Sequence, residues 1–124
     1  MTHHRRTLAV LVALALAALG ACGGSSKSSK STKTAANGAI TVVARDISFD
    51  VGVIKTAPGA LTVTLDNQGA MLHDFKIDKT SLQVKANAGK TATGTVTLAK
   101  GTYNFECTVP GHKQAGMKGT VVVG

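Results

Sequence analysis

The sequence predicts an all-β domain in residues 38–124, a Greek-key antiparallel β-sandwich of about seven to eight strands. Apolar and polar residues alternate with a period of two through most of this region, as they do in half-buried strands. Turn sequences such as APG, NQG, NAG and AKG separate the alternating segments. Because no segment has a convincing helical repeat of about 3.6 residues, the sequence favours a sandwich over any fold that contains helices.

The clearest strand is segment 60–67, in which Leu61, Val63 and Leu65 alternate with polar residues. The last segment is a short, continuously apolar run, which is typical of a buried strand. The expected strands, in chain order, are 40–45, 47–51, 60–67, 73–77, 82–85, 91–99, 101–107 and 119–124.

The first 21 residues have the pattern of a signal peptide. Arg5 and Arg6 precede a run of 12 apolar residues that extends from Leu8 to Leu19. The run is shorter than the roughly 20 residues that cross a bilayer. A charged start, a short apolar run and small residues before a break are typical of secretion signals. The alternative, a buried core helix, has no apolar partner downstream. We therefore expect residues 1–21 to direct export.

The end of this segment, "LGAC" at 19–22, resembles the lipobox of bacterial lipoproteins. The resemblance implies that Cys22 becomes the first mature residue and carries a lipid, which would anchor the protein to the outer face of a bacterial membrane. Each methylene of a buried acyl chain contributes about 0.8 kcal/mol to such anchoring. Residues 23–37 contain no aromatic or large aliphatic side chain. We therefore expect 22–37 to be a flexible tether that begins with the lipidated cysteine.

The charge of the chain is concentrated outside the expected domain. The whole sequence carries a net charge of +8, whereas residues 38–124 contain nine Lys and Arg against six Asp and Glu, a net charge of +3. The chain has one Tyr and no Trp that could stack on bases. These observations argue against nucleic-acid binding, and we expect a monomer.

Four side chains of the domain could meet at one end of the sandwich. Cys107, His112 and Met117 follow one another at intervals of five residues in the loop between the last two strands, and Pro-Gly and QAG turns interrupt this loop. His73 begins an earlier strand, so it can lie at the same end. Taken singly, Cys107 could be a small buried hydrophobe and His112 a solvated loop residue.

The ligand types in this group favour copper. Two imidazoles and a thiolate, with a distant thioether, are the ligand set of a trigonal blue-copper site. Zinc also accepts two histidines and a cysteine, but it usually takes a fourth strong ligand or a water. Since Met is a poor zinc ligand, the group is interpreted as a site for one copper ion.

The segments "HDFKI" at 73–77 and "FECTVPGHKQAGMKGTVVV" at 105–123 resemble the cupredoxin family of type 1 copper proteins. The resemblance covers nearly all of 38–124, and the spacing of Cys, His and Met is most similar to that of rusticyanin and sulfocyanin. It implies that one type 1 copper ion has four ligands: His73, Cys107, His112 and Met117. It also implies a one-electron carrier, not an enzyme, whose partners are redox proteins at the membrane surface.

The resemblance further implies that electrons pass through the solvent-facing edge of His112. Lys113 and Lys118 could steer an acidic partner toward it, although ordinary solvated charge explains them equally well. The apolar surface expected around His112 consists of Val109, Pro110, Ala115 and Met71.

One position departs from the family, and other functions stay open. Many cupredoxins have Asn or Ser after the first histidine, where it ties the ligand loops together, but here the residue is Asp74. Its carboxylate could accept a hydrogen bond from Thr108, and it would favour Cu(II). A copper chaperone, buffer or resistance lipoprotein would transfer metal rather than electrons. A metal-free structural lipoprotein is the third reading.

Overall fold

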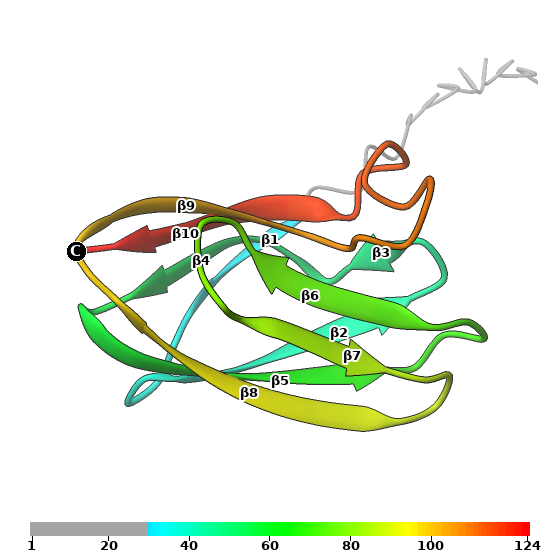
Figure 1. The fold of residues 1–124 in the computed structure, drawn as a ribbon, viewed down its shortest axis with the longest axis horizontal. Helices are drawn as coiled ribbons and strands as arrows, with labels where there is room; N and C mark the ends of the chain where they lie inside the picture. The colour runs from blue at the N-terminus through cyan, green and yellow to red at the C-terminus, as the bar shows by residue number, and fades with distance from the viewer. Residues whose placement is uncertain (1–29) are drawn as a thin grey trace, which may run out of the picture.

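The structure, a computed structural model, describes residues 30–124. The expected signal peptide, Cys22 and the first part of the expected tether lie outside the described residues. Residues 30–124 form ten strands that lie in two facing sheets (Figure 1). Within this described part, no helix is long and apolar enough to cross a membrane. The predicted all-β sandwich is therefore confirmed.

The two sheets are of unequal size. In spatial order, the six-stranded sheet consists of β1 (Ser31–Thr34), β4 (Val51–Thr56), β10 (Lys118–Val123), β9 (Gly101–Glu106), β6 (His73–Ile77) and β7 (Gln83–Ala86). The four-stranded sheet consists of β3 (Ser48–Phe49), β2 (Ala39–Arg45), β5 (Gly59–Asn67) and β8 (Thr91–Leu98). The pairing is mixed rather than purely antiparallel, because β4 runs parallel to β1 and β10, and β2 runs parallel to β5.

The core lies between the sheets and includes three aromatic rings. Alternate residues of β5 are buried, because successive side chains of a strand point to opposite faces. The rings of Phe75 and Phe105 stack with centroids 4.7 Å apart, and Phe49 packs edge-on against them at 5.6 and 5.9 Å. Since Phe75 lies in β6 and Phe105 in β9, this contact supports the two strands that lead to the candidate site.

The structure divides the predicted strand 47–51 between the two sheets. β3 pairs with β2, and the chain then crosses to the six-stranded sheet, where β4 continues beyond the predicted end. Asp50 lies at the crossing, where its Oδ1 accepts a hydrogen bond from Val43 N at 3.0 Å. The period-two pattern missed most of β4, because its first two buried residues, Val51 and Ile54, are three apart and the pairing with β1 is irregular there.

The expectation of a flexible tether over 22–37 is wrong for its last part. Residues 31–34 form β1, which extends the edge of the six-stranded sheet beside β4. An ion pair between Lys33 and Asp50 also holds this strand. A short edge strand is held mainly by backbone hydrogen bonds and buries little apolar surface, so its sequence carries no hydrophobic pattern.

Candidate metal centre

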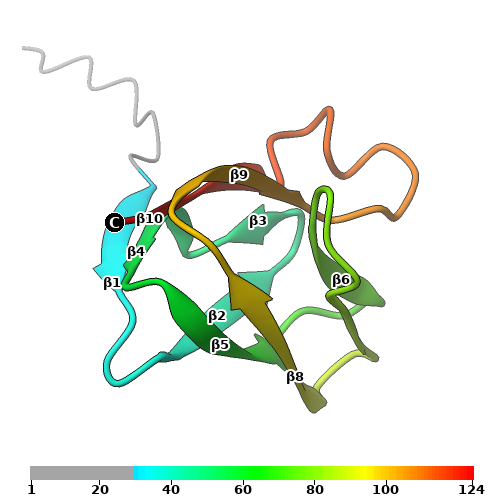
Figure 2. The ribbon, with the colours of Figure 1, turned by 60° about the vertical axis from the view of Figure 1, so that its left-hand side comes forward.

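Two segments at one end of the sandwich carry the four predicted ligands. His73 is the first residue of β6, and the loop 107–117 joins β9 to β10. β9 lies between β6 and β10, and it is antiparallel to both. Glu106, the last residue of β9, pairs with Lys76 near the end of β6, so the chain that leaves β9 continues beside β6 toward His73. In Figure 1 and Figure 2 the loop that follows β9 lies on the same side of the molecule as β6.

Backbone hydrogen bonds close the loop 107–117. Cys107 N donates to Met117 O at 2.9 Å, and Met117 N donates to His112 O at 3.0 Å. Within the loop, His112 N donates to Val109 O at 3.0 Å. Gly111 has φ of 85°, a left-handed conformation that glycine adopts without steric cost. The predicted turn is confirmed, and it returns His112 toward the sheet.

Three of the predicted ligands meet in the interior. Cys107 Sγ lies 3.5 Å from His112 Nδ1 and 4.0 Å from His73 Nδ1. All three ligand atoms lie within 4.8 Å of one another. His73 and Cys107 are fully buried, and His112 is 5% exposed. One sulfur and two imidazole nitrogens therefore surround a common point.

Met117, the fourth predicted ligand, is also fully buried. Its backbone is hydrogen-bonded to the backbones of both Cys107 and His112, so the residue lies at the same end of the sandwich as the three converging side chains. The structure thus brings Met117 to the site, and a bond from its sulfur to a metal is part of the proposal below.

Burial disfavours the charged forms of Cys107 and His73. It raises the pKa of the Cys107 thiol, and burial followed by the nearby His112 ring lowers the pKa of His73. The Nε2 atom of His73 is buried and has no hydrogen-bond partner among the described residues. The nearby backbone of Asp46 favours the protonated form of the His73 ring, but burial outweighs this effect on its pKa. A bound metal cation would stabilise the thiolate and take the neutral imidazoles as ligands, so the donor set fits a metal.

Asp74 links the two ligand-bearing segments. Its carboxylate accepts hydrogen bonds from Thr108 N and Thr108 Oγ1, both at 2.5 Å, and from Gln83 Nε2 at 2.6 Å. Burial opposes ionisation of this carboxyl, but these hydrogen bonds outweigh burial and lower its pKa. The predicted contact with Thr108 is confirmed, and it ties the residue after His73 to the residue after Cys107.

Sequence reasoning missed the role of Asn67, which lies in the recognised NQG turn. Asn67 is fully buried, and its Nδ2 donates to Met71 O and to Ala86 O, both at 2.8 Å. Its Oδ1 accepts from Gly69 N at 3.0 Å. A Cβ at Gly69 would lie 3.2 Å from His73 Nε2. Asn67 thus holds the turn close to the His73 ring. The only signal for this role in the sequence was the NQG turn motif itself.

The surface near the site is partly apolar. Met71 and Leu72, which immediately precede His73, are each 43% exposed. Of the residues predicted to form an apolar surface, Pro110 and Ala115 are exposed and Val109 packs partly against the core. The structure adds Leu72, which the sequence did not single out.

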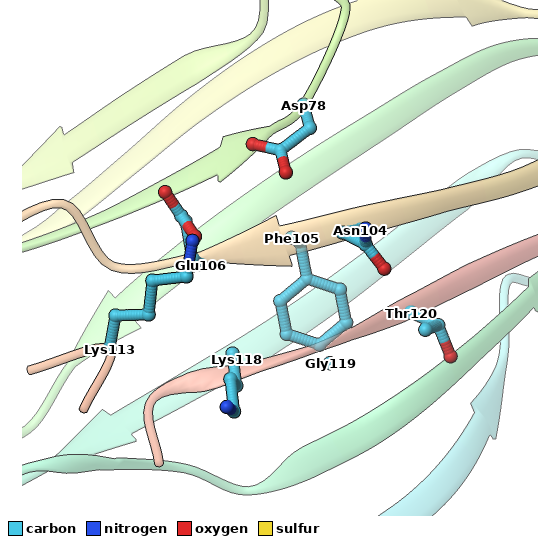
Figure 3. Close-up of a pocket in the computed structure, with 8 residues that line it drawn as sticks. All are labelled: Asp78, Asn104, Phe105, Glu106, Lys113, Lys118, Gly119 and Thr120. Carbon is cyan, nitrogen blue, oxygen red and sulfur yellow. The ribbon is translucent and has the colours of Figure 1, made fainter. Parts of the chain in front are cut away.

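A separate pocket lies on the exposed face of the six-stranded sheet (Figure 3). At its edge, Lys113 forms an ion pair with Glu106, which raises the pKa of Lys113. No candidate ligand lines the pocket, so it is distinct from the metal centre. Its lining residues are Asp78, Asn104, Phe105, Glu106, Lys113, Lys118, Gly119 and Thr120.

The sandwich and the buried group of one cysteine and two histidines define a cupredoxin-like protein. The cupredoxin-like domain family matches residues 9–123, a match that begins inside the segment interpreted as a signal peptide. The chain therefore belongs to this family.

Solved structures with a similar fold include two auracyanins. One is a dithionite-reduced auracyanin from the photosynthetic bacterium Roseiflexus castenholzii, with 24% identity, a TM-score of 0.63, and coverage of 72% of this chain and 98% of that one. The other is auracyanin A, described as a "blue" copper protein, from the green thermophilic photosynthetic bacterium Chloroflexus aurantiacus. It shares 21% identity, with a TM-score of 0.60 and coverage of 69% of this chain and 98% of that one. No curated protein matches the chain.

Proposed function

We propose that the protein is a one-electron carrier that holds one type 1 copper ion. Three ligands would be His73, Cys107 and His112, with Met117 as the distant fourth. The observation that carries this proposal is the convergence of one sulfur and two Nδ1 atoms within 4.8 Å, in a site almost closed to solvent. Membership of the cupredoxin-like family supports it, as does the similar fold of a "blue" copper protein.

The donor set favours copper over zinc. A thiolate, two imidazoles and a weak thioether suit copper, whereas zinc usually takes a fourth strong ligand or a water. When bound, copper supplies one-electron chemistry between Cu(II) and Cu(I). The strands and the hydrogen-bonded loop hold the protein ligands in place. The Asp74 carboxylate adds negative charge beside them, which favours the more positive oxidation state.

The proposed partner is a redox protein that docks near His112. The Nδ1 atom of this ring faces Cys107, so the opposite edge of the ring is directed away from the sulfur. A transient redox contact is expected to bury a small area. Lys113 pairs with Glu106, so it would steer a partner less than its formal charge suggests. The proposed docking surface consists of Met71, Leu72, Val109, Pro110 and Ala115. No substrate is converted in this role.

We expect the purified protein to bind one equivalent of Cu(II), with an intense blue absorption band and a narrow copper hyperfine splitting in electron paramagnetic resonance. Reduction should remove the colour and reoxidation should restore it. Visible and paramagnetic resonance spectra recorded during a copper titration test this expectation. A pale product, or copper retained only as colourless Cu(I), would exclude the electron carrier and favour a copper chaperone or buffer.

We further propose that the protein works outside the cytoplasm, held at the outer face of a bacterial membrane by a lipid on Cys22. Cys22→Ala should shift the protein from the membrane fraction to the soluble fraction, because the residue that would carry the acyl chains is lost. Fractionation of cells that express each form measures this shift. An equal membrane share for both forms would contradict lipid anchoring at this residue.

A further inference from the structure

Lys30, the first residue that the structure describes, reaches the loop that carries Met117. Its Nζ atom donates hydrogen bonds to Gly116 O and to Lys118 O, the latter at 3.0 Å. These two carbonyls belong to the residues on either side of Met117. Lys30, which is 86 residues from Gly116 in the sequence, therefore hydrogen-bonds to both neighbours of a candidate ligand.

Two glycines shape the path of this side chain. β4 lies between β1 and β10, so Lys30 must pass β4 to reach the start of β10. A Cβ at Gly52 in β4 would lie 2.6 Å from Lys30 Cβ, so any side chain at this position would displace Lys30. Gly119 in β10 likewise lets β10 approach β4 closely, since a Cβ at Gly119 would lie 2.2 Å from Gly52 O. The absence of side chains at these glycines makes room for the contact.

The contact places a cation in a partly buried position. Burial, followed by the nearby Lys118 ammonium, lowers the pKa of Lys30. A partly desolvated ammonium is stable only if hydrogen bonds replace its lost hydration, and two backbone carbonyls do so here. The Lys118 side chain itself is exposed, and the residue accepts the hydrogen bond through its carbonyl.

We propose that Lys30 is a positioning residue that holds segment 116–118 and thereby sets how closely Met117 approaches the other ligands. The loop holds the Met117 backbone through hydrogen bonds to Cys107 and His112, and Lys30 holds the carbonyls of the two adjoining residues. The position of the axial ligand tunes a type 1 copper site. The consequence for copper rests on the proposed function, whereas the contact itself does not.

The contact is tested first without metal. In the metal-free full chain, Lys30→Met keeps the length of the side chain but removes both hydrogen bonds. Hydrogen exchange at the amides of residues 116–118 should then become at least about tenfold faster, because hydrogen bonds from a charged group are lost. Lys30→Arg, which can still donate, should restore slow exchange. Lys33→Met is the matched control, since this β1 lysine pairs with Asp50 instead. Unchanged exchange in Lys30→Met would overturn the proposal.

The effect on Met117 is tested with copper bound. Lys30→Met should alter the relative intensities of the visible absorption bands and the symmetry of the paramagnetic resonance signal, which report on the axial ligand. Lys33→Met leaves both of these hydrogen bonds in place, so its spectrum should match that of the parent. Faster exchange without a spectral change would overturn the positioning of Met117. A parent protein without blue colour would instead refute the copper site and leave the exchange result valid.

Discussion

Replacing Cys107 by serine should abolish the blue absorption of the copper-loaded protein, the largest effect that we expect from any single substitution. Serine nearly preserves the volume of the buried side chain, but its hydroxyl does not ionise near neutral pH and is a hard oxygen donor. A site of two imidazoles and a thioether would lack the soft anionic ligand that selects copper. Visible spectra after addition of one equivalent of Cu(II) measure the loss.

The other cysteine provides the control for this substitution. Cys22→Ser changes the same residue type outside the domain and should leave the blue band at full intensity. Circular dichroism of the metal-free Cys107→Ser protein should show an intact β-fold, because serine nearly preserves the volume of the buried side chain. An intense blue band in Cys107→Ser would refute the assigned ligand.

Replacing Asp74 by alanine should destabilise the metal-free fold by about 2–4 kcal/mol, because three hydrogen bonds to a buried carboxylate are lost. Domains of this kind are stable by only about 5–15 kcal/mol, so the loss is a large fraction of the total. Urea unfolding monitored by circular dichroism measures it. Asp66→Ala is the control, since the hydrogen bonds of Asp66 are exposed. Equal losses in both variants would contradict a special role for Asp74.

The same carboxylate should make stability depend on acid. Its pKa is lowered in the folded protein, so the folded state binds fewer protons than the unfolded state as pH falls below about 4, the ordinary range of an aspartate. The stabilisation by Asp74 is therefore complete above that pH and is lost as pH falls through the folded pKa. In Asp74→Asn this part of the acid sensitivity should disappear. Parallel stability curves for the parent and Asp74→Asn between pH 7 and pH 3 would contradict the assignment.

The class of fold followed from the sequence because strand periodicity is local. Alternating side chains reach opposite faces of a strand wherever it pairs, so β5 and β9 could be predicted without knowing their neighbours. The loop 107–117 could be predicted for a similar reason. Its Cys, His and Met are close in sequence, and its Pro and Gly residues are typical of tight turns. His73 required more, because only its residue type, its place at the start of a predicted strand and the family resemblance linked it to Cys107, 34 residues away.

The sequence by itself therefore determined an all-β chain and a candidate set of soft ligands, because both depend on residue type and short-range spacing. Only the tertiary structure decided which sheet each half of segment 47–51 joins, and that residues 31–34 form a strand. It also decided that Asn67 holds the turn before His73 and that Lys30 reaches the carbonyls beside Met117. These features depend on polar contacts between segments distant in sequence. Such contacts leave no periodic pattern, and their partners become neighbours only when the two sheets pack together.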